Sequence, residues 1–112
     1  MANFQNITGV KLGQVAMTTS YQTVYTTPLL TRTFLKDIIV CNTTVSGITF
    51  TAHLVPSAGT ATAANALFYT TALAASSTFQ WSGTQIMDAG DTLQALASAT
   101  GVTLTASGGE AT

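Results

Sequence analysis

The chain has 112 residues, of which 46% are hydrophobic and only 6% are charged, and its formal net charge is −1. This length fits one domain with one core, and the high hydrophobicity excludes a disordered chain. The three basic residues are too few for nucleic-acid or membrane-surface binding, both of which need clustered Lys or Arg. A soluble domain usually has about a quarter of its residues charged. We therefore expect an exterior built from neutral polar side chains or covered by other protein.

Residues 1–20 are polar, contain few large apolar side chains, and predict an N-terminal arm before a single domain over residues 21–112. Such an arm is either frayed or ordered only against a neighbour in an assembly, and the sequence leaves both open. No basic and apolar leader is recognisable at the N-terminus, and Cys41 is the one cysteine. These features favour synthesis in a reducing cytoplasm.

Alternation of Thr with Val, Ile, Leu and aromatic residues predicts strands along most of the chain. Helix signals are nearly absent, because no stretch keeps an apolar stripe at helical spacing. The expected strands cover residues 14–18, 23–26, 33–42, 48–55, 67–71, 78–81, 92–97 and 102–107. About eight short strands separated by turn residues predict an all-β, antiparallel β-sandwich of jelly-roll type.

Two of these strands have informative faces. In residues 33–42 both the odd and the even positions carry apolar side chains, so that strand should be covered on both faces. One face is formed by Phe34, Ile38 and Val40 and the other by Leu35, Ile39 and Cys41. In residues 48–54 the apolar side chains alternate with Thr49, Thr51 and His53. We expect this second set to face solvent or a partner.

Aromatic residues supply the remaining interface candidates. Phe68 and Tyr69 are adjacent in a strand, so one of them leaves the core, and Leu96 points outward if Leu93, Ala95 and Ala97 point inward. An outward aromatic is an interface anchor or a carbohydrate-stacking group, and the low charge favours an interface. The interface candidates are Phe34, Ile38, Val40, Phe68, Tyr69, Trp81 and Leu96; the stacking candidates are Trp81, Tyr69 and Tyr21.

No pattern in the sequence points to catalysis, a cofactor or a metal, and we expect no enzyme. His53 is the one histidine and has no ligand partners at metal-site spacing. Asp88 and Asp91 lack the further oxygen ligands of a calcium loop and fit a type I turn better. Cys41, in an apolar strand, is expected to be a buried and inert thiol. No catalytic, cofactor or metal residue is therefore predicted.

The succession of segments resembles small β-sandwich virion proteins of tailed bacteriophages. The segments that carry the resemblance are 23–28, 35–44, 51–57, 65–69 and 88–95, and it extends over residues 22–110. It implies a virion structural protein, most often a homotrimer, that binds the major capsid protein or other virion proteins. A capsid decoration or cement protein is the first expectation. A neck, tail or head-fibre module and a carbohydrate-binding adsorption module are the alternatives.

Overall fold

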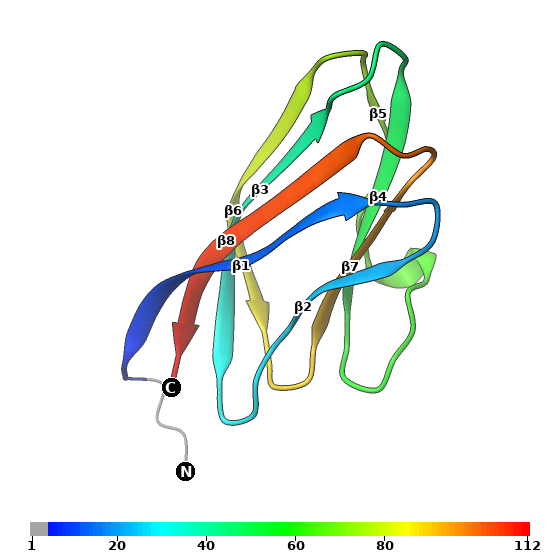
Figure 1. Cartoon of the computed structure of the whole chain (residues 1–112). Helices are drawn as coiled ribbons and strands as arrows, with labels where there is room; N and C mark the ends of the chain where they lie inside the picture. The colour runs from blue at the N-terminus through cyan, green and yellow to red at the C-terminus, as the bar shows by residue number, and fades with distance from the viewer. Residues whose placement is uncertain (1–4) are drawn as a thin grey trace.

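Two four-stranded sheets form the fold (Figure 1), which we describe for residues 5–112 of a computed structural model. The strands are β1 (Ile7–Met17), β2 (Gln22–Thr26), β3 (Arg32–Asn42), β4 (Ile48–Val55), β5 (Ala66–Leu73), β6 (Thr78–Met87), β7 (Thr92–Ala97) and β8 (Val102–Ala111), with a 3-10 turn, η1 (Ala63–Asn65), before β5. The predicted all-β antiparallel sandwich is confirmed.

The strand order is β1-β8-β3-β6 in one sheet and β2-β7-β4-β5 in the other, and every pairing is antiparallel. Two packed sheets of four strands in this order form the jelly roll that the strand count predicted. The core lies between the sheets and is filled from both by apolar side chains, which alternate with Thr along β4 and the first half of β8. The low-charge composition therefore still provides one continuous interior.

A bulge in β3 decides which of its apolar residues reach the core. The register of β3 shifts between Leu35 and Asp37 against both neighbouring strands. Because of the extra residue, Leu35 before the bulge and Ile38 and Val40 after it all lie at 0% exposure. Phe34 remains on the outer face. The prediction that placed Phe34 on the same face as Ile38 and Val40 is therefore wrong.

The first strand begins earlier than the sequence indicates. β1 pairs with β8 along its whole length, although residues 7–17 fall within the predicted arm. A Cβ on Gly13 would approach the Val24 carbonyl oxygen to 2.6 Å, so glycine permits β1 and β2 to meet and close this side of the sandwich. The part of the arm prediction that concerns residues 1–4 lies outside the described residues.

Aromatic rings close the opposite side of the sandwich, between β5 and β6. Phe50, Phe68 and Phe79 pack with centroid separations of 5.0 to 6.0 Å, and Trp81 lies 6.2 Å from Phe68. Tilted and edge-to-face rings at these distances attract each other beyond their burial. Phe68 and Trp81, both predicted as interface residues, are half-buried and pack against the core.

Candidate assembly surface

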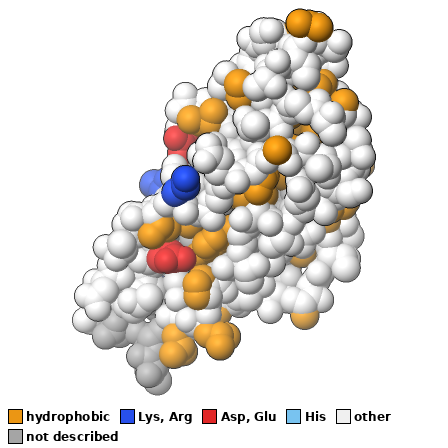
Figure 2. All heavy atoms as spheres, in the orientation of Figure 1, with side chains coloured by type: hydrophobic (Ala, Val, Ile, Leu, Met, Phe, Trp, Pro, Cys, Tyr) orange, Lys and Arg blue, Asp and Glu red, His pale blue; other side chains and the backbone are white. Residues whose placement is uncertain are grey.

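Large apolar side chains are exposed at the end of the sandwich where β1 begins and β8 ends. Leu29 is 86% exposed, Ile7 66%, Leu30 65% and Ile86 45%. The strand register places them at one end: Ile7 lies opposite Ala111, β3 begins directly after the Leu29–Leu30 loop, and Ile86 pairs with Phe34. Figure 2 shows hydrophobic side chains at this end as well as elsewhere on the visible face, and only small isolated groups of charge. Exposed apolar groups that cluster in this way mark interaction surfaces.

A shallow groove of about 350 Å³ crosses the outer face of the first sheet at this end. We call it the glycine groove; its lining is Ile7, Gly9, Phe34, Lys36, Gly108 and Gly109. A Cβ on Gly108 would come within 1.9 Å of the Phe34 carbonyl oxygen, so this position accepts only glycine. A Cβ on Gly9 would meet nothing closer than 3.9 Å. Glycine at position 108 is thus required by the fold, whereas position 9 can accept a side chain with ordinary van der Waals contact.

The loop between β2 and β3, residues 27–31, presents Leu29 and Leu30, and we call it the apolar loop. Leu30 has a φ of 55°, a left-handed conformation that a bulky side chain rarely adopts. The base of the loop is held by backbone bonds, from Thr27 N to Asp91 O at 2.9 Å and from Gly90 N to Thr27 O at 3.0 Å. The two leucines are therefore held outward on a fixed base.

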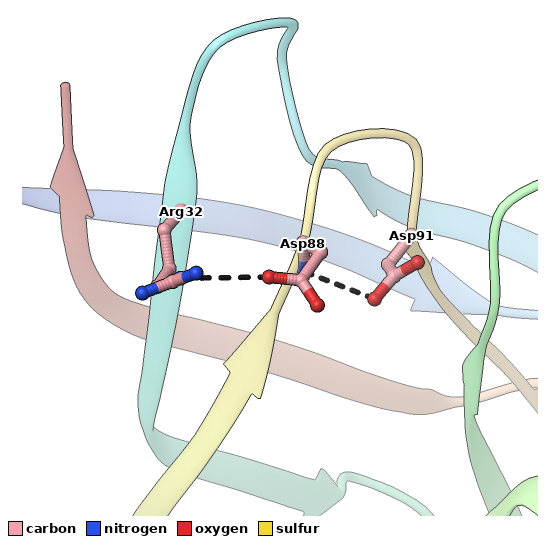
Figure 3. Close-up of polar contacts among 3 residues, drawn as sticks. All are labelled: Arg32, Asp88 and Asp91. Atoms are coloured by element: carbon pink, nitrogen blue, oxygen red, sulfur yellow. Dashed lines mark hydrogen bonds and ion pairs between the residues drawn. The ribbon is translucent and has the colours of Figure 1, made fainter. Parts of the chain in front are cut away.

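The neighbouring turn, residues 88–91, is acidic, and we call it the acidic turn. Asp88 N donates to Asp91 Oδ2 at 3.0 Å, and Arg32 Nε lies 3.4 Å from Asp88 Oδ1 (Figure 3). The Asp88 side chain is 73% exposed, so this ion pair contributes little to stability. Gly90 at the third position has a φ of 90°, which a type I turn does not allow and a type II turn requires. The predicted turn is present, but its predicted type is wrong.

The structure divides the predicted interface residues into three groups. Ile38 and Val40 lie at 0% exposure inside the core, so the prediction that they face a partner is wrong. Phe34, Phe68, Trp81 and Leu96 are half-buried, and Phe34 lines the glycine groove. Tyr69 is 63% exposed on β5. Leu29, Leu30, Ile7 and Ile86 were missed, although a Pro-Leu-Leu run between two strands is a visible signal for exposed leucines.

Leu96 points outward as the alternation predicted, and of the adjacent pair Phe68 and Tyr69 it is Tyr69 that leaves the core. Leu93, Ala95 and Ala97 lie at 0 to 1% exposure, and Leu96 pairs with Thr51 on the opposite face. Cys41 is half-buried and does not have the buried position that we expected. It follows the β3 bulge, which turns it to the outer face together with Ile39.

Among residues 5–112, the polar cluster with the residue types of a catalytic site is built around His53, which is fully buried. Its Nε2 lies 3.0 Å from the Tyr21 hydroxyl and its Nδ1 lies 2.8 Å from Asn65 Oδ1. Asn65 Oδ1 also accepts from Thr62 N, and Asn65 Nδ2 donates to Thr60 O. With Nδ1 protonated, both ring nitrogens are satisfied. The cluster therefore fixes the β4–β5 loop against the sheet.

This result corrects the prediction that His53 faces solvent or a partner. The parity of the strand is as predicted, but the face is covered by the chain's own Tyr21 and by η1. Thr51, on the same face, is 5% exposed and accepts a bond from Thr70 N. The Tyr21 ring packs edge-on against His53, and Trp81 packs against Phe68. Two of the three predicted stacking rings are thus engaged within the fold.

A second polar cluster joins the two sheets near the exposed end. The Tyr25 hydroxyl on β2 donates to Glu110 Oε2 on β8 and lies 2.7 Å from Thr33 Oγ1 on β3. Burial, followed by the hydrogen bond to Glu110, raises the pKa of Tyr25 to about 12. The neutral phenol is therefore the form that the folded protein favours.

Within residues 5–112 no three His, Cys, Asp or Glu side chains are placed to hold a metal ion. None of the described helical segments is long or apolar enough to span a bilayer.

Comparison with known proteins shows a likeness in fold. No known protein family and no curated protein matches the sequence. A chain of the crystal structure of the infectious bursal disease virus particle matches 98% of this chain with a TM-score of 0.55 and 12% identity. A chain of the Gx strain structure of the same virus matches 95% with a TM-score of 0.49 and 14% identity. This chain covers only 31% and 32% of those two chains.

Proposed function

We propose that this chain is a non-enzymatic structural protein of a virus particle, located in the virion after synthesis in the host cytoplasm. The observation that carries the proposal is the exposed apolar end of a jelly roll whose whole sequence is only 6% charged. Exposed leucines at 86% and 65% are costly in a protein that remains alone in water. They are favourable in a protein that becomes covered by neighbours during assembly.

Two further facts support this role. Neutral hydroxyl-rich strand faces can be buried between subunits without the desolvation cost of ions. The jelly roll is a recurrent architecture of virus shells, and the structural match of this chain at a TM-score of 0.55 is to part of a virus particle. The fold by itself does not determine a function, so the argument rests on the surface.

We assign the chain, within that class, to the decoration or cement proteins of a tailed bacteriophage, bound to the major capsid protein as a homo-oligomer, with a trimer favoured. The resemblance of segments within residues 22–110 supports this finer assignment. A symmetric oligomer would also match the symmetry of a shell site.

The test is the binding of purified chain to virus particles that lack it. We expect binding at on the order of hundreds of copies per particle and greater resistance of the particle to heat, because a cement protein occupies every equivalent shell site. About a dozen copies or fewer would assign the chain to the neck or tail instead. Absence from purified particles together with a failure to bind them would contradict the virion role.

A glycan array tests the adsorption alternative with the same protein. Binding that is lost in Tyr69→Ala would favour that alternative, because Tyr69 is the predicted stacking residue with the greatest exposure. Tyr21→Ala is a poor probe, since its hydroxyl is bonded to His53 and its loss would disturb the fold.

A further inference from the structure

We propose that the apolar loop of one copy of this chain docks into the glycine groove of a second copy. The contact would join Leu29 and Leu30 of the loop to the groove walled by Ile7 and Phe34. The inference rests on the homo-oligomer of the proposed function and deepens it, because it names the two surfaces of this chain that meet.

The first argument is that the loop and the groove suit each other chemically. The loop offers two leucines whose side chains are largely exposed, and Leu30 has a strained left-handed conformation above a base that the backbone bonds of Thr27 hold. Strain of this kind persists where the surrounding structure fixes it and is common at sites of function. The groove offers an apolar space of about 350 Å³ over glycine backbone. One or two leucine side chains are of a size to fill part of that space.

The second argument is the complementary charge beside each surface. Asp88 and Asp91 of the acidic turn, with Arg32 next to them, leave a net charge of −1 beside the apolar loop. Lys36 lies at the groove, where its Nζ donates to the neutral hydroxyl of Thr84 at 2.7 Å, a bond that does not neutralise the ammonium. A second copy that places its loop in the groove can bring its acidic turn toward Lys36.

The third argument is that the two copies meet with little general repulsion. The formal net charge of each is −1, and the chain has only seven ionisable Lys, Arg, Asp and Glu residues, three basic and four acidic. The apolar loop and the glycine groove are different surfaces. Each copy therefore inserts its loop into the groove of one neighbour and receives in its own groove the loop of the same or a different neighbour. Contacts between unlike surfaces form a closed ring where the rotation between copies allows it and an open filament where it does not, and two copies that exchange loops form a two-fold pair.

The experiment measures the mass of the purified chain by sedimentation over a range of concentrations. Four variants are compared with the unmodified chain: Leu29→Ser with Leu30→Ser in one chain, Gly9→Val, Lys36→Glu, and Val45→Ser as the control. Val45 is 91% exposed and lies outside the apolar loop and the groove lining, so it matches the leucines in exposure alone. Gly9→Val fills the groove, and a Cβ there makes only an ordinary van der Waals contact, 3.9 Å from Gly108 O, within the protomer. Circular dichroism and thermal unfolding establish that each variant is folded.

We expect the unmodified chain and the Val45→Ser control to associate equally. The loop variant and Gly9→Val should each raise the Kd about a hundredfold, because two buried leucines are lost or excluded. Lys36→Glu should raise the Kd about tenfold, by an amount that salt reduces. A mixture of the loop variant with Gly9→Val should regain association, since one component retains the loop and the other retains the groove.

Three results would overturn the proposal. The unmodified chain could remain a single protomer at high concentration, or both variants could associate as it does. The mixture could also fail to associate when each variant alone does not, which would mean that loop and groove do not bind each other. A lone protomer whose loop variant loses particle binding would assign the apolar loop to another virion protein. Because this test uses the chain alone, its failure leaves the particle-binding experiment intact.

Discussion

The bulge in β3 places two adjacent isoleucines on opposite faces, so their replacement should change the free energy of unfolding by different amounts. Ile38 lies at 0% exposure in the core, whereas Ile39 is 36% exposed and sits between Gln80 and Thr105 on the outer face. Replacement of each by alanine has the same cost in strand propensity, so the difference between the variants reports burial alone. Ile38→Ala should reduce the free energy of unfolding by about 3 to 4 kcal/mol, the sum of lost transfer energy and a cavity. Ile39→Ala should reduce it by about 1 kcal/mol.

These values are large against the stability of the whole domain. A chain of this length has a free energy of unfolding on the order of 10 kcal/mol, and each 1 kcal/mol shifts the Tm by about 4 °C. Thermal unfolding followed by circular dichroism should therefore show a loss of about 14 °C for Ile38→Ala and about 4 °C for Ile39→Ala. Measurements are made at a concentration where the chain is a single protomer. Equal losses, or a larger loss for Ile39→Ala, would refute the register shift and restore Ile38 as an interface residue.

Three further predictions concern polar groups and backbone contacts. Asn42 is 1% exposed, and its Nδ2 donates to the carbonyls of Ser46, Leu73 and Ala74. Asn42→Asp should lower the free energy of unfolding, measured in urea, by about 3 kcal/mol, because a carboxylate then faces those carbonyl oxygens. A loss below about 1 kcal/mol would contradict this. The folded state raises the pKa of Tyr25 from 10.0 to about 12, so the contribution of Tyr25 to stability is complete below pH 10 and is lost between pH 10 and 12. In this range the free energy of unfolding should fall more steeply with pH in the unmodified chain than in Tyr25→Phe. Equal slopes would show that Tyr25 is not the cause. Gly108→Ala should prevent stable folding, since its Cβ would meet a β3 carbonyl oxygen at 1.9 Å, and a soluble variant with unchanged Tm would show that the strands do not approach so closely.

The sequence was sufficient to predict the fold class, because alternation and turn residues are local properties. Two packed sheets follow from strands with one apolar face, and the positions of seven of the eight expected strands agree with the structure apart from their ends. The remaining strand, β1, begins at Ile7 because pairing with β8 orders a polar segment that has little apolar pattern of its own. Non-local pairing of this kind leaves no trace in composition.

The candidate site was predicted less well, and two residues explain why. Lys36 is the extra residue of the β3 bulge against β8, so counting parity through it assigned Ile38 and Val40 to the wrong face. His53 has the parity that was predicted, but a loop twelve residues further along the chain covers it through Asn65. In both cases the decisive contact is between segments whose proximity only the folded chain defines.

The aromatic rings between β5 and β6 allow this edge of the sandwich to be followed by fluorescence. Trp81 is the only tryptophan in the chain, and its ring lies over Gly83 and beside Phe68. Its fluorescence therefore has one origin, and the wavelength of its emission will report whether water reaches that edge. Parting of the two sheets at β5 and β6 would shift the emission to the red even while the rest of the jelly roll stayed intact.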